Sequence, residues 1–277
     1  MDKAILKTLV YADIFDYPLT LREVHKWLIG KKANLRQVEK ALGKKDLLVS
    51  KRRYRERQSA IYFKKAKFIS LFLKIIPWIK LVGVSGSLAM NNAGKKDDID
   101  LFLVITKNRL WISRLLALGL LSLTGQRRKV GDKGKKIAGK LCLNIFLEED
   151  CLEQKTKDIY LAHEVLQMKV LWQRDDIYSR YLSDNEWVFR FLPNWTSGQD
   201  LRFMNNDLRI KNHKSKIVNH KSLIDYIESL TKWFQLKIMQ RPKGMERIED
   251  GALYFHPQDV REKILKLYKQ KLAGLDK

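Results

Sequence analysis

The sequence predicts an α+β protein in which helical segments at both ends of the chain flank a small mixed sheet. Apolar residues recur at helical spacing over the first 42 residues and again over much of the region after residue 150. Short apolar runs rich in β-branched residues, which indicate buried strands, lie at 81–84, 101–105 and 141–147. With 277 residues, 45% of them hydrophobic, the chain can bury a sizeable core in two or three structural units.

The first unit is predicted to span residues 1–66. Helices are expected at 3–17, 20–30 and 34–42, with a capping box from Thr20 to Glu23 starting the second. Apolar runs at 47–49 and 60–63 flank a very basic stretch, which predicts a β-hairpin. Three short helices followed by a hairpin resemble a winged helix-turn-helix domain.

The chain is strongly basic. It holds 55 Lys and Arg against 31 Asp and Glu, a net charge of +24, and residues 1–65 alone hold 17 against 7. Such an excess attracts polyanions, so DNA or RNA is a natural partner, although a Lys-rich composition and a protein-contact role for this unit are alternatives. The residues predicted to contact nucleic acid are Arg36, Lys40, Arg52, Arg53, Arg55 and Arg57.

A Gly-Ser turn follows the first predicted strand of the central unit. An amphipathic helix is expected over 67–77, then the strand at 81–84, then Gly86-Ser87. The segment from Ser87 to Ala93 is long enough for about two helical turns. Gly86-Ser87 would then lie at a helix N-terminus, whose free N–H groups and dipole suit phosphate.

Two carboxylates accompany the second predicted strand. Asp98 and Asp100 are two residues apart, so their side chains point to the same face. They repel each other unless a cation lies between them, and Mg²⁺ is commonly held by one or two carboxylates together with substrate phosphates. A phosphate-binding turn followed by this pair predicts metal-assisted phosphoryl or nucleotidyl chemistry.

Gly86-Ser87 followed by Asp98-Ile99-Asp100 resembles the signature of the DNA polymerase beta-type nucleotidyltransferase superfamily, over about a tenth of the chain. The resemblance implies a nucleotidyltransferase core at 67–150. Gly86 and Ser87 would bind a nucleoside triphosphate (NTP), while Asp98 and Asp100 would hold Mg²⁺ or Mn²⁺ and be catalytic. The implied activity is transfer of a nucleoside monophosphate (NMP) to a hydroxyl of a nucleic acid, a protein or a small molecule. The alternative is a Gly-Ser turn that happens to neighbour a solvated acidic loop.

The third strand departs from the pattern that the resemblance implies. A third carboxylate is expected there, but the polar residue in the middle of the strand is Asn144. An amide can ligate Mg²⁺ yet cannot take a proton from a hydroxyl, and Glu148 or Glu149 could substitute if the register differs. A second hypothesis therefore stays open: a non-catalytic, nucleotide-sensing and nucleic-acid-binding regulator with an incomplete site.

The remaining segments predict fewer functions. The basic loop at 126–140 could hold a triphosphate, and 151–277 is expected to be helical, with a polar linker at about 194–220. Two apolar stripes in the C-terminal helices are predicted to be core.

Two isolated cysteines exclude a disulfide framework, and the run at 110–123 is too short to span a bilayer. A cytoplasmic protein without a membrane partner is predicted.

Overall fold

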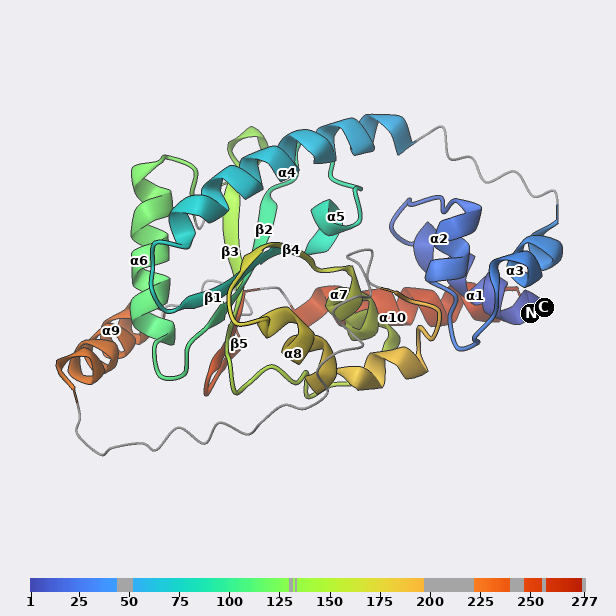
Figure 1. The fold of residues 1–277 in the computed structure, drawn as a ribbon. Coiled ribbons are helices and arrows are strands. Elements are labelled where there is room, and N and C mark those ends of the chain that lie inside the picture. The colour runs from blue at the N-terminus through green and yellow to red at the C-terminus, as the bar shows by residue number, and fades with distance from the viewer. Residues whose placement is uncertain are drawn as a thin grey trace.

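The computed structural model describes residues 1–43, 52–129, 132, 134–196, 222–239, 247–255 and 258–275. Within them the chain forms a mixed six-stranded sheet with helices on both faces, so the predicted α+β class is confirmed (Figure 1). The strands are β1 (Ile79–Val84), β2 (Ile99–Ile105), β3 (Leu141–Glu148), β4 (Lys169–Gln173), β5 (Arg247–Glu249) and β6 (Ala252–Tyr254). The helices are α1 (Asp2–Asp13), α2 (Leu21–Lys26), α3 (Leu35–Leu42), α4 (Arg53–Leu73), α5 (Gly86–Ala89), α6 (Leu110–Leu123), α7 (Ile159–Gln167), α8 (Ile177–Asp184), α9 (Leu223–Met239) and α10 (Gln258–Ala273).

The sheet has the strand order β4-β1-β2-β3-β6-β5. β1 is antiparallel to both β2 and β4, β2 is parallel to β3, and β3 is antiparallel to β6. α6 supplies the crossover that the parallel pair requires. All three strands predicted from apolar runs are confirmed, and β2 lies between the other two.

A separate apolar cluster covers each face of the sheet. On one face, α4 and α6 cover side chains such as Val82 and Leu103. On the other face, α7 and α8 cover Phe102 and Val104, and this cluster continues into α1, α2 and α3. Because β2 contributes to both clusters, all of its residues except Asp100 are buried, as the apolar run from Leu101 to Ile105 requires.

The predicted helices of the N-terminal unit are confirmed, but the predicted hairpin is wrong. Thr20 and Asn34 both begin their helices with capping boxes. Residues 60–63, expected as a strand, lie inside α4, and the other expected strand falls outside the described residues. The reason is that Tyr62, Ala66 and Leu73 form one buried helical stripe, which continues the basic stretch as a helix.

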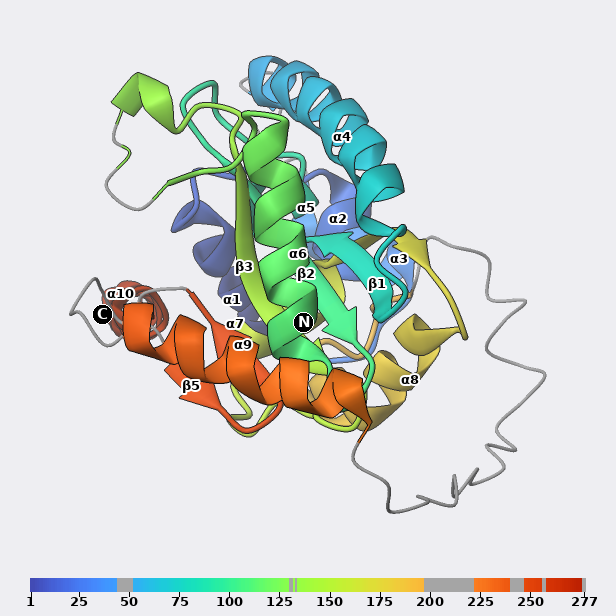
Figure 2. The same ribbon diagram turned by 90° about the vertical axis from the view of Figure 1, so that its left-hand side faces the viewer.

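Two predicted apolar stripes are largely exposed. In the predicted helix over 67–77, Phe68 and Ile75 are 59% and 68% exposed, because Phe68 lies off the buried stripe of α4 and Ile75 lies beyond the end of that helix at Leu73. The other helix of this kind, α9, buries Glu228 and Gln235 against α6 and leaves Leu230 63% exposed (Figure 2). Polar contacts to α6 therefore override the apolar pattern of α9.

The C-terminal region is less helical than predicted. It contributes β4, β5 and β6 to the sheet, while α10 packs against α1 and α7. Between β4 and residue 192 the helical structure is divided into α8 and a short 3-10 helix, η3 (Glu186–Arg190). Most of the predicted linker lies outside the described residues. Among those described, no helix combines the length and apolar character needed to cross a bilayer.

Candidate nucleotide and metal site

The predicted Gly-Ser turn lies at a strand-to-helix junction. β1 ends at Val84, and α5 begins two residues later with Gly86 and Ser87. α5 has one turn instead of the predicted two, because Asn91 adopts a left-handed conformation with φ 57° and the Asn92 N–H donates back to the Ser87 carbonyl at 2.9 Å. The first-turn N–H groups of α5 are the groups to which the sequence prediction assigns phosphate binding.

Gly86 lies directly against Asp100. Its φ is +62°, and a Cβ built at this position would lie 2.9 Å from Asp100 Oδ2. A side chain here would be strained by the backbone and would also meet the carboxylate. The glycine therefore brings the turn and the acidic side chain together as one site.

The predicted carboxylate pair also converges. Asp98 lies one residue before β2 and Asp100 is its second residue, and ligand atoms of both lie within 4.8 Å of each other and of Cys142 Sγ. Burial and the neighbouring Asp98 raise the pKa of Asp100 well above its ordinary value. No described residue hydrogen-bonds to the Asp100 carboxylate. Such a group is stabilised by an added cation.

Arg128, from the predicted basic loop, supplies the positive charge that now faces this pair. Its Nη1 lies 2.5 Å from Asp98 Oδ2, and the Arg128 side chain is 38% exposed. Carboxylate oxygens that converge beside the Gly-Ser turn are the kind of hard ligand that Mg²⁺ or Mn²⁺ prefers. When an ion binds, Arg128 would have to break its ion pair with Asp98 or share the carboxylate with the ion.

The strand register places Cys142, and not Asn144, directly beside Asp100. Asp100 pairs with Cys142 and Leu101 with Leu143, but Phe102 then pairs with Ile145, so Asn144 is the extra residue of a β-bulge. Burial, followed by the two aspartates, raises the pKa of the Cys142 thiol. A protonated thiol is a poor ligand for a hard ion.

The alternative carboxylates at the end of β3 lie too far along the strand. Glu148 pairs with Ile105, at the opposite end of β2 from Asp100. Glu149 N–H donates to the Ile105 carbonyl, and its carboxylate forms an ion pair with Lys80 at 2.7 Å. Neither can replace a third carboxylate, so β3 contributes none.

The Ser87 hydroxyl is already hydrogen-bonded to a neighbouring carboxylate. Its hydroxyl donates to Asp97 Oδ2 at 3.2 Å, and the same oxygen accepts from the Gly94 N–H at 2.8 Å. Asp97 thus closes the loop between α5 and β2. The Ser87 hydroxyl would have to turn from Asp97 to reach a phosphate.

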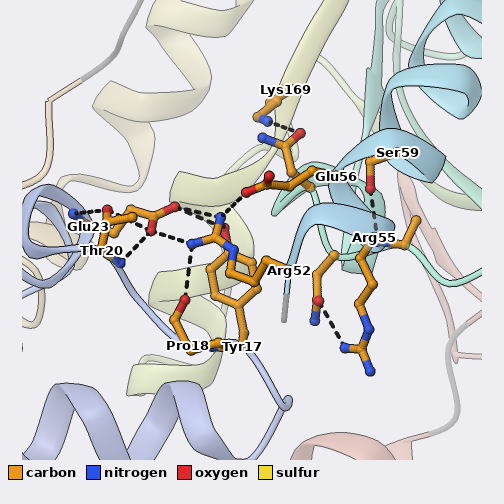
Figure 3. Close-up of polar contacts among 12 residues, drawn as sticks. Tyr17, Pro18, Thr20, Glu23, Arg52, Arg55, Glu56, Ser59 and Lys169 are labelled. Carbon is orange, nitrogen blue, oxygen red and sulfur yellow. Dashed lines mark hydrogen bonds and ion pairs between the residues drawn. The ribbon is translucent and has the colours of Figure 1, made fainter. Parts of the chain in front are cut away.

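Arg52, predicted to contact nucleic acid, is instead a buried structural residue (Figure 3). It is 4% exposed, donates to Glu23 at 2.5 Å and to Tyr17 Oη at 2.6 Å, and lies over the Tyr17 ring. Figure 3 also shows Arg55 turned away from Arg52; its guanidinium pairs with Asp16 at 2.8 Å. Both arginines hold α4 to the N-terminal helices.

The other predicted nucleic-acid contacts are exposed. Arg36 and Lys40 lie one turn apart on α3, and Arg53 and Arg57 lie one turn apart on α4. No ion pair is formed by any of the four with another described residue. Their side chains are accessible to a polyanion, which leaves nucleic-acid binding as a prediction that depends on these four residues.

The sequence reasoning missed a set of residues on α7. Tyr160, His163 and Glu164 line a cavity of about 470 Å³ whose wall also includes Gly86 and Ser87. The available signal was an acidic residue, Glu164, between the apolar residues of an otherwise buried helix.

Comparison of the chain with models of protein families, with curated proteins and with solved structures found no match.

Proposed function

We propose that the protein is a Mg²⁺-dependent nucleotidyltransferase that moves an NMP from an NTP to a hydroxyl acceptor. The observation that carries the proposal is the approach of Gly86 to Asp100, which joins a phosphate-binding turn to a carboxylate pair. Neither half would be specific alone. Together they match what a Mg²⁺-bound triphosphate requires: backbone donors for phosphate and hard anionic ligands for the ion.

In this proposal Asp98 and Asp100 hold the ion, and the Gly86 and Ser87 N–H groups bind the outer phosphates. When bound, Mg²⁺ would neutralise charge that develops on the phosphates. The acceptor oxygen forms a bond to the α-phosphorus while the bond from that phosphorus to the bridging oxygen breaks, and pyrophosphate leaves. The chain needs no nucleophilic side chain, because positioning and electrostatic stabilisation lower the barrier.

A nucleotide-binding regulator without transferase activity is the second candidate function. Cys142 beside Asp100 favours it, because a protonated thiol cannot accept the proton of an acceptor hydroxyl. Nucleotide binding through the Gly-Ser turn and the two aspartates would persist in such a protein. Both candidate functions therefore predict nucleotide binding, and only the transferase predicts transfer of an NMP.

Label transfer tests the proposal. The protein is incubated with each α-labelled NTP and Mg²⁺ or Mn²⁺ in the presence of RNA, DNA and cell extract, and labelled products are separated. Asp98→Asn and Asp100→Asn should each abolish transfer, whereas Asp150→Asn, an exposed site after the far end of β3, should not. Unchanged transfer in the first two variants would reject the assignment. Metal-dependent NTP binding without labelled product would favour the regulator.

A further inference from the structure

The cavity beside the Gly-Ser turn lies between the N-terminal helices and the sheet-bearing core. Its volume is about 470 Å³, within the range of roughly 300–1,000 Å³ typical of small-molecule sites. α1, together with Leu19 and Trp27 on either side of α2, forms one side of it, and α5 and α7 form the other. Since Gly86 and Ser87 belong to its wall, a molecule bound there would reach the proposed phosphate and metal site.

Aromatic side chains form much of the wall. Tyr11, Tyr17, Trp27 and Tyr160 all line the cavity. His163 is stacked between two of them, with ring centroids 4.2 Å from Tyr11 and 5.1 Å from Trp27. Ring faces carry negative electrostatic potential and attract cations, most strongly where water is excluded.

Glu164 adds an ionisable carboxyl group to this wall. Gln167 is its hydrogen-bond partner, and no cationic side chain among the described residues forms an ion pair with it. That is unexpected in a chain with a net charge of +24, where a Lys or Arg partner is easily supplied. A buried carboxylate without a cation is costly, and burial raises the pKa of Glu164 to about 7.

The other charged or titratable groups that face the cavity do not supply that cation. Arg55 is engaged by Asp16 at 2.8 Å and by Asn92 at 2.9 Å. Burial lowers the pKa of His163 to about 3, so its ring is neutral, and its Nε2 has no hydrogen-bond partner among the described residues. Asp97 adds a second carboxylate, which receives only the Ser87 hydroxyl and the Gly94 N–H. Arg52 lies over the Tyr17 ring at 4.1 Å and Lys26 over the Trp27 ring at 5.6 Å, so the part of the wall without a cation of its own is formed by Tyr160, Glu164 and Asp97.

From these features we infer that the cavity binds the acceptor, and that this acceptor is a hydroxyl-bearing organic cation whose ammonium group lies against Glu164 and the Tyr160 ring. The inference rests on the proposed transferase function. The acceptor hydroxyl would point past Gly86 toward Asp100. Its proton passes to solvent as the oxygen joins the α-phosphorus and pyrophosphate leaves. A flat neutral nucleobase would use the rings but would leave the charge of Glu164 uncompensated.

Direct binding of a matched pair of probes tests this inference without NTP or metal. Choline carries a hydroxyl and a quaternary ammonium, and 3,3-dimethylbutan-1-ol is its neutral isostere. Titration calorimetry at pH 8 should show choline binding at least tenfold more tightly than the alcohol. Glu164→Gln should weaken choline at least tenfold and leave the alcohol unchanged, whereas the exposed control Glu153→Gln should change neither.

Proton release supplies a second readout that loss of structure does not mimic. Repeating the choline titration at pH 7 in two buffers of different ionisation enthalpy should reveal protons released from wild-type Glu164, and none from Glu164→Gln. Equal affinity for choline and the alcohol would overturn the inference. So would a tenfold loss of GTP affinity in Glu164→Gln without choline binding, which would assign the cavity to the nucleobase. Asp98→Asn and Asp100→Asn should retain choline binding, so failure of transfer and failure of this site remain distinguishable.

Discussion

The backbone of Gly86 lies so close to the Asp100 carboxylate that a side chain at position 86 would collide with it. A Cβ at position 86 would lie 2.9 Å from Asp100 Oδ2, and the φ of +62° disfavours any residue with a side chain. Gly30 provides a natural comparison, because its φ is +72° and a Cβ there would meet nothing within 4 Å. Substitutions at these two glycines can therefore distinguish the effect of backbone strain from the effect of contact with Asp100.

Gly86→Ala should therefore lose NTP binding, while Gly30→Ala should keep it. Both substitutions incur the left-handed backbone penalty, about 1 kcal/mol of unfolding free energy each. Only Gly86→Ala also displaces Asp100, so we expect it to cost about 1 kcal/mol more. Denaturant unfolding measures the stability of both variants, and titration calorimetry with an NTP and Mg²⁺ measures their binding. Equal losses of stability and retained binding in both variants would show that the contact has no role.

Arg128→Gln should strengthen binding of a divalent ion to the protein without nucleotide. The guanidinium is 2.5 Å from Asp98 and competes with an ion for that oxygen. Removing one nearby positive charge at a partly exposed site should tighten the dissociation constant several-fold, on the order of 1 kcal/mol. Paramagnetic resonance of free Mn²⁺ measures it. Arg127→Gln is the control, since Arg127 hydrogen-bonds Ser122 instead of the aspartates. An equal change in both variants would indicate only a long-range charge effect.

Glu164→Gln should stabilise the ligand-free protein above neutral pH. The folded pKa of Glu164 is about 7 and the ordinary value is 4.5, so between these values the folded state keeps a proton that the unfolded state has lost. Wild-type stability therefore falls as pH rises through this window. Relative to wild type, the variant should gain about 2–3 kcal/mol at pH 8 and almost nothing at pH 4. Urea unfolding at both values measures this gain. A gain that does not depend on pH would show that ionisation of the buried carboxylate is not its cause.

The local patterns that predicted the fold correctly are those in which a few adjacent residues determine the outcome. Capping at Thr20 and Asn34, the apolar strands, and the spacing of Asp98 from Asp100 all belong to this class. The convergence of Gly86, Asp98 and Asp100 could be predicted because a single strand-turn-strand segment contains it.

What the sequence did not predict depends on contacts between distant segments. The bulge that places Cys142 beside Asp100 depends on how β3 aligns with β2, more than 40 residues away in the sequence. α9 turns its apolar stripe outward because Glu228 accepts from the Trp111 N–H at 2.7 Å and the Ile112 N–H at 2.9 Å. The basic stretch predicted as a hairpin is a helix because Tyr62, Ala66 and Leu73 form one buried stripe, and Arg52 at its start is buried against Glu23 and Tyr17. Periodicity cannot show which distant partner a polar residue finds.

Arg52→Met should destabilise the protein far more than Arg53→Met, although the two arginines are adjacent in the sequence. The Arg52 side chain is 5% exposed and connects Glu23, Tyr17 and the Pro18 carbonyl, so its removal leaves a partly buried carboxylate without its cation. Breaking a buried pair in this way costs about 3–5 kcal/mol, whereas an exposed arginine such as Arg53 costs about 0.5 kcal/mol or less. Denaturant unfolding gives both values. Gel shifts with RNA and DNA at rising salt should show the opposite order, since the accessible Arg53 can reach phosphate and Arg52 cannot. Loss of nucleic-acid binding in Arg52→Met, measured at temperatures where the variant remains folded, would instead show that Arg52 contacts nucleic acid.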